Sequence, residues 1–401
     1  MSRLSTPPLS LYLHFPWCVR KCPYCDFNSY TLHGELAEEH YVNALERDIQ
    51  SQSVALAGRE IVSIFMGGGT PSLFSPRAIA RVLDATRAHL AVVSDVEITM
   101  EANPGTIERG RFAEYRAAGI NRVSLGAQSF NAQRLETLGR IHSPDETRRA
   151  AAELHTAGLD NFNLDLMYAL PGQDLNEALY DVEAAIALGP THLSHYQLTL
   201  EPGTVFAAQP PRGLPSDDAA AEILAACAGR LGAAGFTQYE VSGYAQTNKQ
   251  CRHNLNYWTF GDYLGVGAGA HGKLTFRDSE TIVRTVQARD PRRYLSAVPA
   301  ALTTKEVPSA DLPFEFMLNA LRLVEGFEID TFVQRTGLQW EQVAPTVQAL
   351  VDRKLLMAVG SRIHATLVGL RFLNDLLLSF LALRPLETPQ TTGAFGLSTA
   401  L

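Results

Sequence analysis

The strongest signal in this chain is residues 12–25, which read YLHFPWCVRKCPYC. They begin inside a short apolar segment, 9–15, whose composition predicts a buried strand that ends at Pro16. Three cysteines then follow within eight residues, in the spacing C-x3-C-x2-C. The chain has 401 residues and five cysteines in all, an odd number that argues against a secreted disulfide framework. We therefore expect metal or redox chemistry in a reducing compartment.

The overall composition excludes several classes of protein. Apolar residues make up 46% of the chain and charged residues 19%, which is typical of a globular protein. The net charge of −8 gives no global positive field for nucleic-acid binding. The sequence has no run of 18 apolar residues and no apolar segment of a secretory signal at its start. We expect a cytoplasmic protein with no transmembrane segment and no nucleic-acid partner, while peripheral membrane contact stays open.

Strand-like and helix-like segments alternate between residues 9 and 205. The expected strands are 9–15, 61–66, 96–100, 122–125, 162–167 and 192–200. Helical periodicity follows each of the first five, which indicates βαβ units and a parallel sheet. A closed eight-unit barrel takes roughly 250 residues. The sequence therefore predicts an α/β fold with an open, partial (β/α)6 barrel, and a doubly wound sheet is the alternative.

The chain divides into four parts by composition and pattern. We assign residues 1–245 to the barrel domain and 246–304 to a connecting segment that is dense in glycine between 261 and 272. Residues 305–381 form a small helical domain, and 382–401 form a flexible tail. The pattern of the small domain, three helices and a hairpin turning at Gly360-Ser361, resembles a winged helix. Because no basic recognition helix is evident, we expect this domain to have a packing role.

The cysteines follow the first strand, at the edge where parallel barrels carry their active sites. Thiolates at this spacing in a loop can converge on one iron–sulfur cluster. Zinc is the competing metal, but a structural zinc site takes four ligands, and no fourth Cys or His stands nearby at a matching spacing. Three thiolates on a four-iron cluster leave one iron open to another ligand. Cys18, Cys22 and Cys25 are therefore the candidate metal ligands.

The pattern C-x3-C-x-aromatic-C on a first βα loop resembles the radical SAM superfamily. This resemblance implies a 4Fe–4S cluster held by Cys18, Cys22 and Cys25, with S-adenosylmethionine (SAM) bound to the fourth iron. It also implies reductive cleavage of the sulfonium to a 5′-deoxyadenosyl radical. The cofactor carries that chemistry, while the protein orients it and excludes water.

Further motifs, YxHxPxC, GGGTPS, EANP, GAQSF and DLMYALPGQ, are similar to the oxygen-independent coproporphyrinogen III oxidase-like family over residues 9 to about 380. That family also contains heme chaperones. Glycine lets the backbone approach a ligand, and carboxylate and Arg side chains pair with polar ligand groups, although each is also common in caps and loops. By motif position, the resemblance implies these SAM-contacting residues: Tyr12, Tyr24, Gly68, Gly69, Thr70, Glu101, Gln128, Arg140 and Asp165.

Three features distinguish the branches of this family. The oxidase has a fourth cysteine two residues after the third, where this chain has Phe27, and it has a longer N-terminal arm than Cys18 allows here. Residues 253–258, HNLNYW, match an HNxxYW motif that resembles the heme chaperones. We therefore expect a chaperone that takes heme from a donor and passes it to an acceptor hemoprotein. The alternative is the coproporphyrinogen dehydrogenase of porphyrin biosynthesis, and whether the chain is an enzyme stays open.

Within the HNxxYW motif, His253 is a candidate axial ligand of heme iron. Tyr257 and Trp258 could stack on a porphyrin face. The alternative is that His253 is a hydrogen-bonded structural residue, with Cys251 and His271 as rival ligands. His14, on the first strand beside the cysteines, either touches a substrate or only packs.

Overall fold

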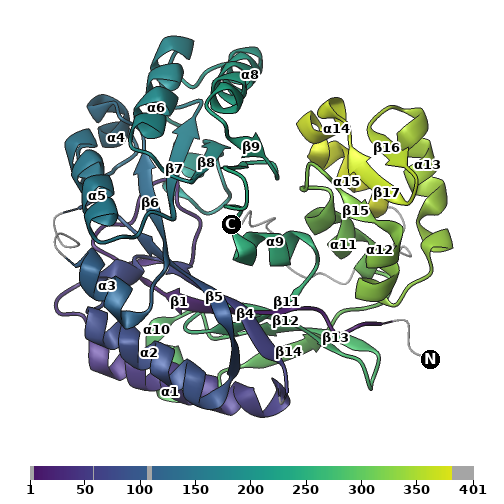
Figure 1. Cartoon of the computed structure of the whole chain (residues 1–401), viewed down its shortest axis with the longest axis horizontal. Coiled ribbons are helices and arrows are strands. Elements are labelled where there is room, and N and C mark those ends of the chain that lie inside the picture. The colour runs from purple at the N-terminus through teal and green to yellow at the C-terminus, as the bar shows by residue number, and fades with distance from the viewer. Residues whose placement is uncertain (1–3, 57, 106–110, 382–401) are drawn as a thin grey trace.

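The computed structural model describes residues 4–56, 58–105 and 111–381. At its centre is a 12-stranded sheet in the order β14-β13-β12-β11-β1-β4-β5-β6-β7-β8-β10-β9. Seven neighbouring strands in this sheet pair in parallel, and the sheet curves around helix α9 (Figure 1). They are β11 (Asp262–Val266), β1 (Leu9–Phe15), β4 (Glu60–Gly68), β5 (Ala91–Ala102), β6 (Arg122–Gln128), β7 (Phe162–Tyr168) and β8 (His192–Gln197).

Six of these strands are the predicted ones, so the partial (β/α)6 barrel is confirmed. Its outer helices are α1 (Glu38–Ser53), α2 (Pro76–His89), α3 (Phe112–Ala118), α4 (Ala132–Thr137), α5 (Pro144–Thr156), α6 (Leu175–Ala187) and α8 (Asp217–Ala233). At the start of α2, the Ser75 side chain accepts a hydrogen bond from the N–H of Ala78, which is the cap that the sequence predicts. The first residues of the expected helix 106–118 lie outside the described residues.

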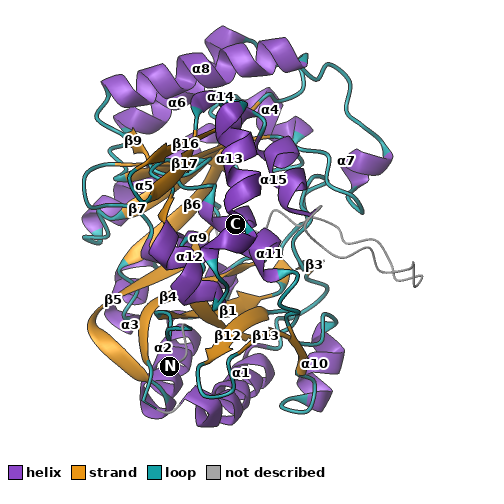
Figure 2. Cartoon of the chain, turned by 90° about the vertical axis from the view of Figure 1, so that its right-hand side faces the viewer, coloured by secondary structure: helices purple, strands orange, loops and turns teal. Residues whose placement is uncertain are grey.

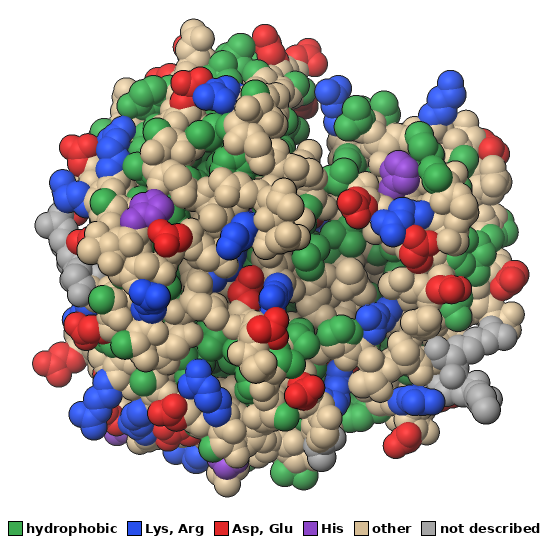
Figure 3. Space-filling model, viewed as in Figure 1, with side chains coloured by type: hydrophobic (Ala, Val, Ile, Leu, Met, Phe, Trp, Pro, Cys, Tyr) green, Lys and Arg blue, Asp and Glu red, His purple; other side chains and the backbone are tan. Residues whose placement is uncertain are grey.

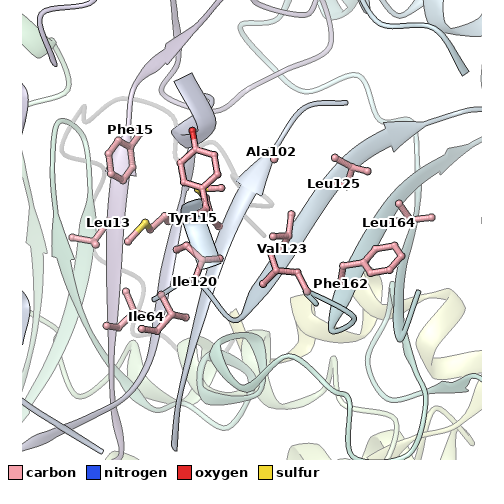
Figure 4. Close-up of a cluster of buried hydrophobic side chains, with 14 of the residues drawn as sticks. Leu13, Phe15, Ile64, Ala102, Tyr115, Ile120, Val123, Leu125, Phe162 and Leu164 are labelled. Atoms are coloured by element: carbon pink, nitrogen blue, oxygen red, sulfur yellow. The ribbon is translucent and has the colours of Figure 1, made fainter. Parts of the chain in front are cut away.

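The hydrophobic core lies between the sheet and these helices. In Figure 4, side chains of neighbouring strands, among them Leu13, Ile64 and Val123, line one face of the sheet, and Tyr115 of α3 lies among them. Successive side chains of a strand point to opposite faces. On β1, Leu13 therefore enters this core, whereas Tyr12 and His14 point into the barrel, where they can serve a site.

The segment 246–304, expected as a connection, continues the barrel sheet. It begins with helix α9 (Arg252–Trp258) and then adds β11 in parallel to β1. Three antiparallel strands follow, β12 (His271–Phe276), β13 (Thr281–Val286) and β14 (Thr303–Glu306), with helix α10 (Pro291–Ala297) between the last two. The dense glycines explain how these strands fit together. A β-carbon on Gly265 would lie only 2.0 Å from the carbonyl oxygen of His271. At the other edge, β10 (Gly243–Ala245) and β9 (Thr237–Gln238) complete the sheet.

The C-terminal domain has the predicted order of three helices and a hairpin. Its elements are α11 (Leu312–Ala320), β15 (Phe327–Glu328), α12 (Ile329–Thr336), α13 (Ala344–Asp352), β16 (Leu356–Val359), β17 (Arg362–Ala365), α14 (Leu367–Arg371) and α15 (Leu373–Leu381). A separate apolar core holds them together, with Phe316 and Phe332 fully buried. Figure 2 shows this domain in front of the barrel, with α12, α13 and α15 facing the viewer. The expected tail, 382–401, lies outside the described residues.

The surface gives two further observations. In the space-filling view, acidic and basic side chains are interspersed, and a notch separates the C-terminal domain from the upper end of the barrel (Figure 3). Among the described residues, no helix combines the length and apolarity needed to cross a membrane.

Candidate functional site

Residues 18–29, here called the cysteine loop, are closed by a pair of two-residue strands, β2 (Trp17–Cys18) and β3 (Tyr30–Thr31). The N–H of Tyr30 donates to the carbonyl of Pro16 at 2.8 Å. Within the loop, the N–H of Cys25 donates to the carbonyl of Cys22 at 3.2 Å. This turn brings the second and third cysteines back toward each other, so backbone hydrogen bonds shape the loop.

The three thiols of this loop are partly buried and lie within electrostatic reach of one another. Burial is the main cause that raises the pKa of the Cys18 thiol to about 11; Thr70 opposes this shift, and nearby Cys25 and Cys22 add to it. Burial likewise raises the pKa of Cys25. Among the described residues, no three Cys, His, Asp or Glu side chains are grouped tightly enough to hold a single metal ion. Three neighbouring thiols without a fourth ligand therefore fit a cluster, whose irons each take one thiolate, better than a closed zinc site.

The glycines at the end of β4 and just after it hold the strand end against the residues that lead into the cysteine loop. The N–H of Gly69 donates to the carbonyl of Phe15 at 2.7 Å, and that of Thr70 donates to Trp17 at 2.8 Å. A β-carbon on Gly69 would lie 2.6 Å from the same Phe15 oxygen. Gly68 has a φ of +104°, and its N–H donates to Glu101 Oε2 at 3.1 Å. The close approach that these glycines permit is therefore, first of all, a contact between two backbone segments of this chain and not a contact with a ligand.

His14 connects a candidate SAM contact to the cysteine loop. Its Nε2 lies 2.9 Å from the carbonyl oxygen of Asn28, and its Nδ1 lies 3.0 Å from Tyr12 Oη. Because a carbonyl only accepts, Nε2 carries the proton and the Tyr12 hydroxyl donates to Nδ1. The Asn28 amide in turn donates to the carbonyls of Ala268 and Arg289, each at 3.0 Å. His14 is therefore a buried connecting residue in this structure, with both ring nitrogens engaged.

Arg140 comes directly after α4 and reaches the cysteine loop. Its Nη1 lies 3.6 Å from Cys22 Sγ, and its Nη2 donates to Asn103 Oδ1 at 2.5 Å and to the carbonyl of Gly126 at 2.8 Å. Asn103 Nδ2 donates to Thr70 Oγ1 at 2.9 Å. Asn103 was not among the predicted site residues, although it stands in the quoted EANP motif two positions after Glu101. It brings together side chains that follow β4, β5 and β6.

Two carboxylates complete this edge of the barrel. The pKa of Glu101 is raised to about 8, mainly by burial and then by nearby Asp165, while the N–H of Gly68 opposes the shift. Burial also raises the pKa of Asp165, which accepts hydrogen bonds from Asn163 Nδ2 at 2.8 Å and Ser124 Oγ at 3.1 Å. The pair can accept hydrogen bonds from ligand hydroxyl or ammonium groups.

The remaining predicted contacts, Gln128 and Tyr24, have partners that the sequence did not indicate. Gln128, at the end of β6, has a φ of +65°, and its Oε1 accepts a hydrogen bond from Tyr196 Oη at 2.7 Å. A positive φ at a residue other than glycine is a strained conformation that is common in functional sites. Tyr24 packs on Phe206 of α7 (Val205–Ala208), with ring centroids 6.4 Å apart. Neither Tyr196 nor Phe206 stands in a motif, so only the fold reveals them.

The HNxxYW motif forms α9 and lies toward the opposite end of the barrel. His253 is only 3% exposed, and its Nδ1 lies 3.3 Å from Ser63 Oγ. Asn256 Nδ2 donates to Ser10 Oγ at 2.9 Å. Both serines lie in the amino-terminal halves of their strands, β4 and β1. These hydrogen bonds of the motif residues hold α9 inside the barrel, against β4 and β1.

The His253 ring packs between aromatic side chains, with centroids 5.0 Å from Phe65 and 4.9 Å from Tyr257. Burial is the main cause that lowers its pKa to about 3, so the ring is neutral. Trp258 lies under the guanidinium of Arg322, at 4.3 Å. This is the arrangement of a structural histidine. Heme ligation by His253 stays a prediction, and it would require α9 to move.

The two alternative heme ligands, Cys251 and His271, differ in their exposure to solvent. Cys251 is fully buried, and its Sγ lies 3.7 Å from Glu97 Oε1. His271, at the start of β12, is exposed. Of the two, His271 alone could meet a ligand without a change in the fold.

The fold and the cysteine loop together define a radical SAM protein. Residues 12–185 match the model of the Radical SAM superfamily, and residues 307–372 match that of the HemN C-terminal domain. The heme chaperone HemW of Escherichia coli K12 is 49% identical over 381 residues, covering 94% of this chain and 99% of that protein. The Bacillus subtilis protein of that name is 31% identical, covering 93% and 99%. This chain belongs to the HemW family, as its motifs predict.

A solved structure supports the fold. The coproporphyrinogen III oxidase (HemN) of Escherichia coli superimposes with a TM-score of 0.79, covering 94% of this chain and 91% of that one. The two sequences are 22% identical, so this likeness concerns the architecture alone.

Proposed function

We propose that this protein is a heme chaperone, which binds heme and transfers it to an acceptor hemoprotein. The observation that carries this proposal is the near-full-length similarity to proteins named heme chaperone HemW, at up to 49% identity. Phe27 supports it, because the oxidase branch has a cysteine at this position. Here the Phe27 carbonyl accepts hydrogen bonds from Lys21 Nζ at 2.9 Å and from the N–H of Ser29 at 2.6 Å. We place the protein in the cytoplasm, where thiols stay reduced.

We further propose that Cys18, Cys22 and Cys25 hold a 4Fe–4S cluster with exchangeable SAM. Cluster and SAM together supply a one-electron centre when bound. Arg140 contributes positive charge beside Cys22 and can pair with a ligand carboxylate. Glu101 and Asp165 offer acceptors to ligand hydroxyl or ammonium groups.

The heme site that we propose includes α9. Tyr257 stacks on Tyr263, with centroids 4.1 Å apart, so the helix brings a broad aromatic surface to the barrel. His253 lies beneath that surface, and it can reach heme iron only if α9 leaves its place against Ser63 and Ser10. Heme binding would then be coupled to displacement of α9.

The function is tested by heme binding and transfer. Cluster-loaded protein is titrated anaerobically with hemin, and its Soret band is followed before and after addition of apomyoglobin as a reporter acceptor. We expect saturable binding and transfer of the bound heme. Absence of saturable binding contradicts the proposal.

The oxidase alternative is tested on the same preparation. SAM, a reductant and coproporphyrinogen III are added, and protoporphyrinogen is measured. We expect none, and its catalytic formation would assign the chain to the oxidase reaction.

The proposed heme ligand, His253, is tested separately with a matched control variant. His253→Ala should change the Soret band of bound heme. His142→Ala should not, because His142 is a buried histidine that bonds the carbonyl of Ala127 elsewhere in the barrel. An unchanged spectrum in His253→Ala would exclude this ligand.

A further inference from the structure

Asn103 has both ends of its side-chain amide engaged at the edge of the barrel that faces the cysteines. The Arg140 guanidinium can only donate, so the oxygen of the amide must face it, at 2.5 Å. The nitrogen of the amide therefore faces Thr70 Oγ1, at 2.9 Å. This chemistry permits only one orientation of the amide.

The two partners of Asn103 each carry a donor to a cysteine. Arg140 Nη1 lies 3.6 Å from Cys22 Sγ. Because the Thr70 oxygen accepts from Asn103, its own proton is free to be donated, and Thr70 acts on the neighbouring Cys18 as a hydrogen-bond donor that lowers the pKa of that thiol. We call Thr70, Asn103 and Arg140 the polar circuit, since they join the first cysteine to the second.

The backbone fixes the polar circuit in advance. Thr70 is held by the hydrogen bond from its N–H to Trp17, and Arg140 by one from its N–H to the carbonyl of Leu135. Gly139, beside Arg140, packs so closely on the cysteine loop that a β-carbon there would lie 2.7 Å from Pro23 Cδ. The backbone therefore places both donors beside the cysteines, and Asn103 is the side chain that bonds to both of them and sets their direction.

We infer that Asn103 is a positioning residue that aims hydrogen-bond donors at two cluster-ligating sulfurs and thereby tunes the reduction potential of the cluster. This inference rests on the cysteine ligation proposed above. Hydrogen bonds to the sulfurs of an iron–sulfur cluster are among the factors that set its potential. They stabilise the reduced, more negative state, so their loss makes the midpoint potential more negative.

The test compares Asn103→Ala and Thr70→Val with a matched control, Asn43→Ala. Asn43 also accepts an Arg hydrogen bond, from Arg81 Nη2 at 2.7 Å, but it lies on α1, outside the barrel. Iron and sulfide content, thermal stability, the midpoint potential without SAM and the resonance Raman iron–sulfur bands are measured on each reconstituted protein. We expect a more negative midpoint and shifted bands in the first two variants, and wild-type values in the control.

A conservative substitution separates the effect of the Thr70 hydroxyl from a merely structural role of this residue. Thr70→Ser keeps the hydroxyl donor and should restore the wild-type midpoint, which a merely structural role of Thr70 would not require. An unchanged midpoint and unchanged bands in Asn103→Ala, at full iron content, overturn the inference. If Asn103→Ala loses its cluster, equal midpoints in Thr70→Val and Thr70→Ser overturn the inference instead.

The failure of this inference can be told apart from that of the proposals above. Wild-type protein without iron and sulfide would contradict the proposal that the three cysteines hold a cluster. Failed heme transfer at normal potentials would contradict only the chaperone function.

Discussion

A β-carbon placed on Gly68 would lie 2.2 Å from Cε1 of His14. The absence of a side chain at Gly68 is thus what gives the imidazole its room between Tyr12 and Asn28. Through His14, the end of β4 is thus adjusted to the last residues of the cysteine loop.

Gly68→Ala should therefore disturb the cysteine loop as well as the strand. Its φ of +104° disfavours any β-carbon, and the overlap with His14 adds to that cost. We expect a loss of more than about 2 kcal/mol in the free energy of unfolding, together with poor cluster incorporation. Gly203→Ala is the control, because its φ is +85° but no atom lies within 4 Å of the added carbon. Chemical denaturation that ranks the two variants equally would contradict the steric argument.

Replacing His14 should weaken SAM binding without removing a cysteine. His14→Phe leaves the Tyr12 hydroxyl and the Asn28 carbonyl without their present partner, which costs about 1–3 kcal/mol for a buried polar group. His14→Gln retains one donor and one acceptor and should recover part of the loss. Equilibrium dialysis with SAM and thermal unfolding check both effects. Equal SAM affinities in wild type and His14→Phe would show that the connection is not needed.

The stability of the protein should depend on pH through Glu101. Its folded pKa of about 8 lies above its ordinary value of 4.5, mainly because of burial and then because of Asp165. The folded state therefore binds the proton more tightly, and this contribution is present below pH 4.5 and is lost as the pH rises toward 8. Glu101→Gln should remove a few kcal/mol of this dependence at most, since one pKa unit is about 1.4 kcal/mol. Urea unfolding at several pH values measures how the free energy of unfolding of each protein depends on pH. The same pH dependence in wild type and Glu101→Gln would contradict this prediction.

Cys22→Ser should abolish the brown absorbance of the reconstituted protein, because one of the three proposed ligands is lost. Iron and sulfide analysis quantifies the effect. Cys227→Ala is the matched control, since Cys227 is a fully buried core residue of α8 and should leave the iron content unchanged. Normal iron and sulfide in Cys22→Ser would disprove the ligand assignment.

The local part of the fold was predictable from the sequence. The strand 9–15 and the helix that Ser75 caps match the structure, because apolar runs and capping residues are local signals. Strand β11 was missed, because Gly265 and the glycines that flank the strand weaken its pattern and its partner β1 lies some 250 residues earlier. No local signal specifies such a pairing.

The same limit applies to the site. The cysteines and the motif residues could be named in advance, since they stand in recognisable spacings. Asn103 and Tyr196 gain their roles only from the side chains that the fold brings beside them. For the HNxxYW motif, the letters point to a histidine beside two aromatic side chains, but they do not show that the segment is a helix or that His253 is buried inside the barrel.

Asn28 ties the cysteine loop to the carbonyls of Ala268 and Arg289. A ribosome releases the three cysteines long before it makes those carbonyls, so the nascent chain carries its thiols in a loop that lacks these two anchors until residue 289 has been made. We therefore expect the loop to reach its final form, ready for the proposed cluster, only late in synthesis. Fragments that end before residue 289 should bind iron less tightly than the whole chain, however well their barrel strands have formed.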